Sequence, residues 1–342
     1  MDIFLNILFF VIGIVLLIKC ADFFVSGSSA IAKKLKVPML IIGLTIVAFG
    51  TSLPELAVSI SSAIKGSTDM AAGNVIGSNM FNMLFILGFV ALFNSVKLAD
   101  SAKSFDLPFM VIVTAMLAIV SCDTIFDGAA ANTITRVESF ILVGFMLYYF
   151  IVLVKNGIKY SKINLEHAFE KNKEIPKFEN KPEKDTKELK VWQMIVYTIC
   201  GLAAVVFGGE CVSATSQFLA IKAGMSEALV GLTIVAMGTS LPEFATSVIA
   251  AKKGETDLAL GNVIGSNILN IVLILGVCGS ITKIPVSMTI LTDLLILLVF
   301  TIVLAIMALR KGRLKRTEGI ILICMFFAYM AFAIVRNYCF PY

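Results

Sequence analysis

Two glutamates lie inside strongly apolar stretches of the chain, and each follows two hydroxyl side chains and a proline. The first stretch, GLTIVAFGTSLPE, ends at Glu55, and the second, GLTIVAMGTSLPE, ends at Glu243. A carboxylate is costly inside a membrane, and one found there indicates a functional site. Carboxylate, hydroxyl and carbonyl oxygens are the hard ligands that Ca²⁺, Na⁺ and Mg²⁺ prefer. The pattern therefore predicts a site for a hard cation within the membrane.

A second polar block follows each glutamate. It reads GSTDMAAGNVIGSNMFNMLFILG from Gly66 and GETDLALGNVIGSNILNIVLILG from Gly254, and the copies of both blocks are 188 residues apart without a gap. The chain is thus two copies of one unit. Two intramembrane carboxylates placed by a repeat predict one ion site shared by the two halves.

A helix cannot run undisturbed through the first block, because Pro54 lacks an N–H and clashes with the carbonyl of Gly50. Carbonyls released by the break become available as ligands. The hydroxyls of Thr51 and Ser52 add further oxygens, and Thr51 shares a helix face with Glu55. The second copy supplies Thr239, Ser240, Pro242 and Glu243.

The second block also combines ligands with close packing. Ser78 and Asn82 are four residues apart and share a helix face. Gly73 and Gly77 form a GxxxG motif, which lets another helix approach closely. The equivalent residues of the second copy are Gly261, Gly265, Ser266 and Asn270.

Composition requires a membrane protein, since 58% of the residues are hydrophobic and only 15% are charged. Apolar runs of about 20 residues are long enough to cross a bilayer as helices. Ten such segments are expected, at about 2–30, 38–64, 70–94, 107–122, 134–155, 191–220, 227–251, 257–280, 286–309 and 316–337.

The expected fold is an all-α membrane protein of ten transmembrane helices, arranged as two inverted-topology repeats of five. Because five is odd, the second repeat enters the membrane from the opposite side, an architecture typical of secondary transporters. Residues 1–155 form the first repeat, 156–190 a hydrophilic cytoplasmic loop and 191–342 the second repeat. The loop mixes Lys with Glu and contains two prolines, which favours a solvated linker.

The distribution of basic residues predicts the orientation. With both termini outside, the cytoplasmic connections contain 22 Lys and Arg and the outside connections and tail contain five. Such an excess marks the cytoplasmic side. The chain is therefore expected in the cytoplasmic (inner) membrane, with the lipid bilayer as its surroundings and with no nucleic acid or obligate protein partner evident.

The blocks resemble a known signature. GTSLPE followed by GNVIGSNxxN, in both halves of a ten-span protein, resembles the repeats of the calcium/cation antiporter superfamily, and prokaryotic sodium/calcium exchangers most closely. The resemblance implies a secondary active antiporter that exchanges Ca²⁺ for Na⁺ and needs no cofactor. It implies Glu55 and Glu243 as central ligands, and it adds Thr51, Ser52, Ser78, Asn82, Thr239, Ser240, Ser266, Asn270 and the backbone carbonyls of Ala48 and Ala236.

The resemblance also implies that the first and sixth spans slide as a gating pair against the other eight. Asp22 and Glu210, which are also 188 residues apart, are expected on those two helices. Lys19 stands three residues before Asp22, and we assign that pair only a structural role.

One residue departs from part of the superfamily. Several relatives, including potassium-dependent exchangers, carry Asp at the position of Asn270, so this site has two formal negative charges instead of three. Potassium co-transport and the sodium stoichiometry are thereby put in question. Exchange of Ca²⁺, or of another divalent cation, for H⁺ is the alternative, because two protons balance two carboxylates as well as one Ca²⁺ does.

Other function classes fit less well. The single histidine, His167, lies in the hydrophilic loop, so no buried Ser–His pair of an intramembrane hydrolase can form. A GxxxxGK[ST] phosphate-binding loop is missing from the sequence, which argues against ATP as the energy source. A channel or a cation sensor stays open as a further alternative.

The charge distribution gives a test of topology. Lys65 and Lys222 are expected on one side of the membrane, and position 175 in the 156–190 loop on the other. Single cysteines at these positions, on a cysteine-less background, should react with impermeant reagents from opposite sides. Labelling of positions 65 and 175 from the same side would refute the orientation.

Overall fold

The chain folds into a bundle of long helices. The computed structural model describes residues 3–66, 68–126, 131–171, 189–223 and 236–339. Among these residues, eight helices are long and apolar enough to cross a membrane, and a bent pair raises the number to nine. The expected span at 227–251 falls partly outside the described residues. The helical fold class is confirmed in this coarser form, as a bundle of eight or nine candidate spans.

The elements of the first half are α1 (Ile3–Leu35), α2 (Met39–Ile42), η1 (Gly43–Val47), α3 (Ala48–Thr51), α4 (Leu53–Ile64), α5 (Thr68–Met80), η2 (Phe81–Ile86), α6 (Leu87–Phe93), β1 (Val96–Lys97), η3 (Ala102–Asp106), α7 (Leu107–Val120), α8 (Asp123–Phe126), β2 (Thr133–Ile134) and α9 (Arg136–Lys171). Those of the second half are α10 (Val191–Lys222), α12 (Ala236–Gly238), α13 (Leu241–Lys252), α14 (Thr256–Leu269), η5 (Asn270–Leu275), α15 (Gly276–Ile281), β3 (Ile284–Pro285), α16 (Met288–Lys311), β4 (Arg313–Leu314) and α17 (Arg316–Cys339). The η elements are π-helical turns.

The predicted break before Glu55 is present. The helix bends by 44° between Thr51 and Leu53, and Ser52 at the corner has left the helical conformation (φ −83°, ψ 5°). Pro54 occupies the first turn of α4, where its missing N–H leaves no helical hydrogen bond unmade. The second copy breaks in the same way at Ser240 (φ −92°, ψ 9°), between α12 and α13.

The second block also contains a helix irregularity in each half. A π-helical turn, η2, begins at Phe81 and includes Asn82, and another, η5, begins at Asn270. π-helical turns widen the backbone spiral locally and are frequent at functional sites. Two of the predicted ligands are therefore on distorted turns.

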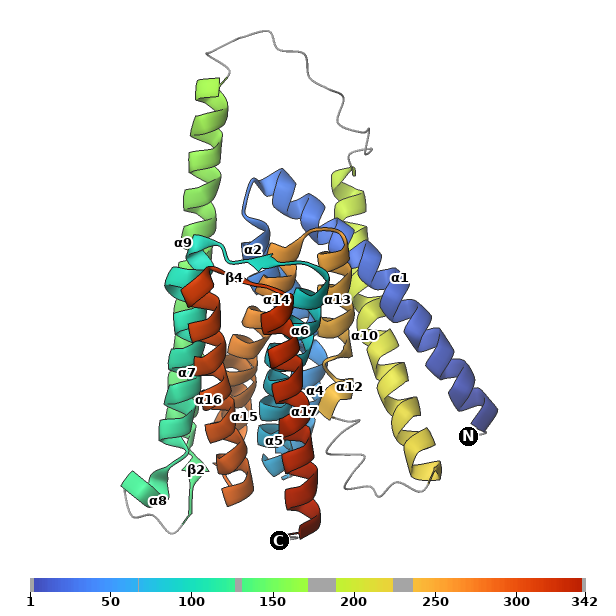
Figure 1. Ribbon diagram of the computed structural model, residues 1–342, viewed down its shortest axis with the longest axis vertical. Helices are drawn as coiled ribbons and strands as arrows, with labels where there is room; N and C mark the ends of the chain where they lie inside the picture. Colours follow the sequence, from blue (N-terminus) through green and yellow to red (C-terminus); the bar gives the residue numbers. More distant parts are fainter. Residues whose placement is uncertain (1–2, 67, 127–130, 172–188, 224–235, 340–342) are drawn as a thin grey trace.

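Burial separates central from peripheral helices. Two spans are largely buried inside the bundle. The buried share of the most apolar part is 94% in the span of α14, η5 and α15, and it is 78% in the span of α5, η2 and α6. The corresponding share for α1 is only 17%. The helices with the second polar block thus form the centre, whereas α1 and α10 lie together at one edge of the bundle (Figure 1).

Glycines bring two central segments to backbone contact. A Cβ added to Gly261 would lie 2.5 Å from the carbonyl oxygen of Leu40, and one added to Gly265 would lie 2.7 Å from the Cβ of Ala48. Gly43 faces the same contact, since its added Cβ would lie 3.0 Å from the Cα of Gly261. The GxxxG motif of the second copy therefore packs the way its spacing predicts.

Two small antiparallel sheets join the halves. β1 pairs with β4, and β2 pairs with β3. β4 and β2 lie at opposite ends of the bundle (Figure 1). Each sheet therefore ties a connection of one half to a connection of the other. The sequence analysis did not predict these strands, because two residues give no detectable alternation.

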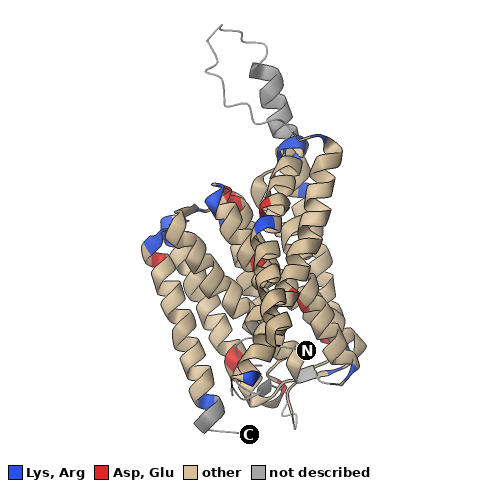
Figure 2. Cartoon of the chain, turned by 90° about the vertical axis from the view of Figure 1, so that its right-hand side faces the viewer, with Lys and Arg blue, Asp and Glu red and all other residues tan. Residues whose placement is uncertain are grey.

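Basic residues gather at one end of the bundle (Figure 2). That end contains the C-terminal ends of α1 and α16, and both chain termini lie at the other end (Figure 1). One expectation needs correction, because the helix expected to end near residue 155 continues to Lys171. Proline first occurs at Pro176 in this region, so no proline interrupts the helix before that residue.

The glycine contact predicts a strong effect of one methyl group. Gly261→Ala should destabilise the protein by about 1–3 kcal/mol, because its Cβ meets the backbone of Leu40 and cannot be relieved by a rotamer change. Gly144→Ala on α9 is the control, since nothing lies within 4 Å of its added Cβ. Thermal unfolding in detergent should show a lower transition temperature for Gly261→Ala alone.

Candidate functional site

The two helix breaks meet inside the bundle, and each completes the other. Ser52 Oγ donates to Glu243 Oε1 at 3.1 Å, and Ser240 Oγ donates to Glu55 Oε1 at 2.9 Å. All four side chains are buried, and both glutamates have no exposed surface. The serine of one half thus binds the carboxylate of the other, which places both predicted central residues in one site.

The local sequence alone would suggest a different partner. Ser52-Leu-Pro-Glu55 has the S-x-x-E spacing of a capping box, in which serine binds the N-terminus of its own helix. In the structure Ser52 caps α4 without a side-chain hydrogen bond to that helix, and Ser240 does the same at α13. Tertiary pairing between the halves replaces the local cap.

Several buried oxygens of the site have no hydrogen-bond partner among the described residues. They include the second carboxylate oxygens of both glutamates and the side-chain oxygens of Ser78, Asn82 and Asn270. A buried polar atom without a partner is unfavourable and needs an explanation. All five are hard oxygen donors, which fits coordination of Ca²⁺ or Na⁺.

The remaining predicted residues surround this centre. Ser266 Oγ lies 3.0 Å from Ser52 Oγ and 3.5 Å from Glu243 Oε1. The hydroxyls of Thr51 and Thr239 instead contact asparagines of the opposite half. The Ala48 carbonyl accepts the backbone N–H of Ser52 at 3.1 Å, so it keeps a helical partner. Ala236 begins α12, directly before the second break.

The sequence analysis missed a pair of asparagines that join the halves. Asn262 Oδ1 lies 3.0 Å from Thr51 Oγ1, and Asn74 Oδ1 accepts from Thr239 Oγ1 at 3.4 Å. Their amide nitrogens bind serines of their own half, Asn262 to Ser247 at 2.9 Å and Asn74 to Ser59 at 3.2 Å. Identity of these residues in both copies was the available signal.

Asparagines of the second block also form a chain of hydrogen bonds between the halves. Asn270 Nδ2 donates to Asn79 Oδ1 at 3.1 Å, and Asn79 Nδ2 donates to the carbonyl of Asn267 at 3.2 Å. Asn270 therefore uses its nitrogen as a structural donor, and its oxygen has no hydrogen-bond partner among the described residues. This division suits an amide that both holds the two halves together and offers an oxygen ligand.

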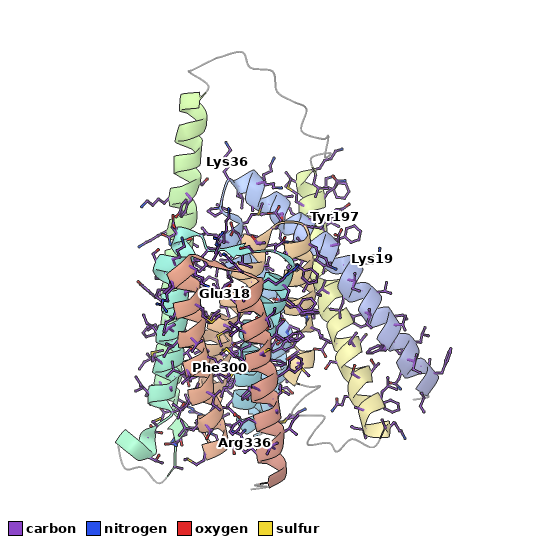
Figure 3. All side chains as sticks on the ribbon, in the orientation of Figure 1. Lys19, Lys36, Tyr197, Phe300, Glu318 and Arg336 are labelled. Carbon is purple, nitrogen blue, oxygen red and sulfur yellow. The ribbon has the colours of Figure 1, made fainter. Side chains whose placement is uncertain are left out.

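The expected gating residues are on the two peripheral helices. Asp22 is on α1 and Glu210 is on α10, and both are exposed. The expected pairing of Asp22 with Lys19 is wrong, because Asp22 binds Lys253. Lys19 points away from the bundle on the outer side of α1 (Figure 3). Lys19 is one helical turn from Asp22 in sequence, but Lys253 on another element forms the ion pair with Asp22 instead.

Two further ion pairs fix the last helix. Arg336 binds Asp293 of α16 through two nitrogens at 2.9 and 2.8 Å, and Glu318 binds Lys311. Arg336 and Glu318 lie toward opposite ends of α17 (Figure 3). These pairs join α16 to α17 away from the glutamates, so we assign them a structural role.

The described residues lack the side-chain groupings that hold soft metals such as zinc or copper. Among those residues, no three His, Cys, Asp or Glu side chains are grouped so that they could hold a metal ion. Two carboxylates with neutral oxygens form a set of hard donors, which suits Ca²⁺ or Na⁺ better than a soft transition metal.

Comparison with known proteins agrees with this geometry. The family model described as sodium/calcium exchanger protein matches residues 5–155 and again residues 193–335. Antiporter CaxA of Alkalimonas amylolytica is 37% identical over 94% of this chain and 96% of its own length. The sodium/calcium exchanger MaX1 of Methanosarcina acetivorans is 33% identical over 97% of this chain and 99% of its own length.

The fold matches a solved exchanger. A structure of the sodium-calcium exchanger NCX_Mj, soaked with Na⁺ and Ca²⁺, superposes with a TM-score of 0.79 and 26% sequence identity. The match covers 96% of this chain and 98% of that chain. The resemblance noted from the two repeated blocks is thereby confirmed.

Proposed function

The chain belongs to the sodium/calcium exchanger family, and we propose that it exchanges Ca²⁺ for Na⁺ across the cytoplasmic membrane by alternating access. The observation that carries the proposal is the pair of buried glutamates, each bound by the serine of the opposite half and each with one oxygen left for a cation. A hydrolase would need a nucleophile and a base, whereas these carboxylates are surrounded by cation ligands.

The architecture proposed for this function is ten spans in two inverted repeats, at 1–155 and 191–342, joined by the 156–190 segment. Two separate matches to one family model support the division. The sheets support the inversion, because β1 and its repeat equivalent β3 pair at opposite ends of the bundle. A two-fold axis in the membrane plane exchanges the two sheets, as in other transporters of this kind.

Glu55 and Glu243 are proposed as the central ligands. Thr51, Ser52, Ser78, Asn82, Thr239, Ser240, Ser266 and Asn270 line the site, together with the carbonyls of Ala48 and Ala236. Support comes from the free oxygens of Ser78, Asn82 and Asn270. For Ala48 the role requires that its carbonyl bind an ion in addition to the N–H of Ser52, which a carbonyl with two lone pairs can do.

Sodium is proposed as the counter-ion because neutral hydroxyl, amide and carbonyl oxygens suit dehydrated Na⁺ and cannot take up a proton. Exchange of three Na⁺ for one Ca²⁺ moves one net charge and couples transport to voltage, by about 2.3 kcal/mol per 100 mV. Exchange of two H⁺ for one Ca²⁺ is the second candidate, favoured by the presence of two carboxylates. It is electrically neutral and would not respond to voltage.

The basic end of the bundle (Figure 2) is proposed as the cytoplasmic side, with both termini outside. The ion gradient supplies the energy, so the proposal includes neither a cofactor nor an obligate protein partner. The lipid bilayer and the transported ions are then the molecules that the chain contacts.

The central test is the flux of radioactive Ca²⁺ into proteoliposomes. Uptake should follow an imposed Na⁺ gradient and should fall to background in Glu55→Gln and Glu243→Gln, because either variant leaves one negative charge for a divalent ion in a low-dielectric interior. Glu138→Gln is the control, since Glu138 caps α9 through Thr135 away from the site. Uptake driven by a pH gradient alone would select the Ca²⁺/H⁺ alternative, and near-normal uptake by either site variant would overturn the proposal.

Asn270→Asp tests the charge of the site. The new carboxyl cannot donate to Asn79 Oδ1 unless it is protonated, and it adds a third acid beside two glutamates. Transport by the parent should be independent of K⁺, and the variant should depend more steeply on pH. Equal pH and K⁺ profiles for both proteins would mean that position 270 does not line the ion path.

A further inference from the structure

Lys253 joins the peripheral helix α1 to the central part of the second half. Its Nζ lies 2.8 Å from Asp22 Oδ1, 2.9 Å from the Asp22 carbonyl and 2.6 Å from Ser26 Oγ. An ammonium group has three protons, and all three find acceptors on α1. Lys253 is thus engaged with a single helix that it can reach only while α1 lies against this end of α13.

The two elements that this contact joins differ in their attachment. α13 contains Glu243 in its first turn and ends one residue before Lys253, so the lysine is fixed to the helix of a proposed central ligand. α1 packs along α10, and Leu17 and Ala21 of α1 form a small core with Val205 and Val212 of α10, against which side chains of α13 also pack. Because α1 and α10 pack on each other far more extensively than on any other element, they can shift as a pair, and the Lys253 contact opposes such a shift at one end.

The other half contains equivalent charges that form no such ion pair among the described residues. The equivalents of Asp22 and Lys253 are Glu210 on α10 and Lys65 at the end of α4, both at the offset of 188 residues. Within the described part of the chain, Lys65 and Glu210 are exposed and form no ion pair with each other. Four charges are therefore placed by the repeat, but only one of the two pairs is closed.

We propose that these pairs are alternating latches, Lys253–Asp22 on the cytoplasmic face and Lys65–Glu210 on the outer face. Each is closed in the state in which the other is open. The present structure has the cytoplasmic latch closed, and the opposite state closes Lys65 onto Glu210. The inference rests on the proposed inverted repeat and alternating access, and it assigns to these four residues the role of setting which face is shut.

The latches are unequal, which gives the resting protein a preferred side. A second ion pair, Lys33–Glu255 at 3.5 Å, supports the cytoplasmic latch. Its repeat equivalents are Ile221 and Ser67, which cannot form an ion pair. Asp22 and Lys253 are partly exposed, with 53% and 30% of their side-chain surfaces accessible. Such pairs are weak, so the latch can bias the two states and still release.

Distances between spin labels at the two faces test the proposal without any transport measurement. On a cysteine-less background, labels at positions 222 and 64 report the outer face, and labels at 34 and 97 report the cytoplasmic face. The outer-closed fraction is the share of molecules with a short distance between labels 222 and 64. Lys253→Glu places a negative charge against Asp22, so the ratio of outer-closed to cytoplasm-closed molecules should rise about fivefold, which corresponds to ~1 kcal/mol. Lys252→Glu is the matched control, because Lys252 lies over the Phe93 ring and forms no ion pair with α1 among the described residues.

The decisive variants are those at the outer face, where Lys65 and Glu210 form no ion pair within the described part of the chain. Lys65→Glu added to Lys253→Glu should return the outer-closed fraction toward the parent value, because it breaks the second latch. Glu210→Lys added to both should raise that fraction again, since the pair is restored with its charges exchanged. A merely structural role for these exposed residues predicts no change in either step.

Two results would overturn the latches. One is an unchanged distance distribution in Lys253→Glu, and the other is a distribution in Lys253→Glu that Lys65→Glu does not alter. Failure of the proposed function is a separate outcome, because absence of Na⁺-driven Ca²⁺ uptake together with the expected distance changes would reject the exchange and leave the latches in place.

Discussion

The constraint on which the site depends is the burial of two carboxylates that one half of the chain cannot satisfy. Each glutamate takes its hydrogen bond from the serine at the helix break of the other half. Neither repeat can therefore complete a site alone. Loss of the serine at one break would remove the hydrogen-bond donor of the glutamate in the other half, which gives a physical reason for the near identity of the two blocks.

Close packing is what brings these breaks together. In lipid no hydrophobic force drives helices against each other, so small residues that allow backbone contact have the largest effect. Gly43, Gly261 and Gly265 let α14 touch the segment before the first break, and at that separation Asn262 reaches Thr51. A bulkier side chain at these glycines would separate the halves by more than the length of a hydrogen bond allows.

Sequence predicted those features of the fold that follow from the type of a residue alone, such as proline or a long apolar run. Pro54 determined the break at Ser52, and apolar length determined the helical spans. Contacts across the repeat could not be predicted, because Ser52 has an equally plausible local partner as a helix cap. For the same reason Asp22 was assigned to Lys19, the nearest lysine in sequence, whereas the fold presents Lys253.

Equivalent residues of the two near-identical blocks have different hydrogen-bond partners. Ser266 lies against Glu243, whereas its equivalent Ser78 has no partner among the described residues. Thr51 approaches Asn262 to 3.0 Å, and its equivalent Thr239 lies 3.4 Å from Asn74. For two copies of one sequence, exchange of these environments costs little free energy, so the arrangement with the roles reversed is close in energy. Residues that differ between the copies, such as Glu255 and its sequence equivalent Ser67, are then the ones that can distinguish the two arrangements in free energy.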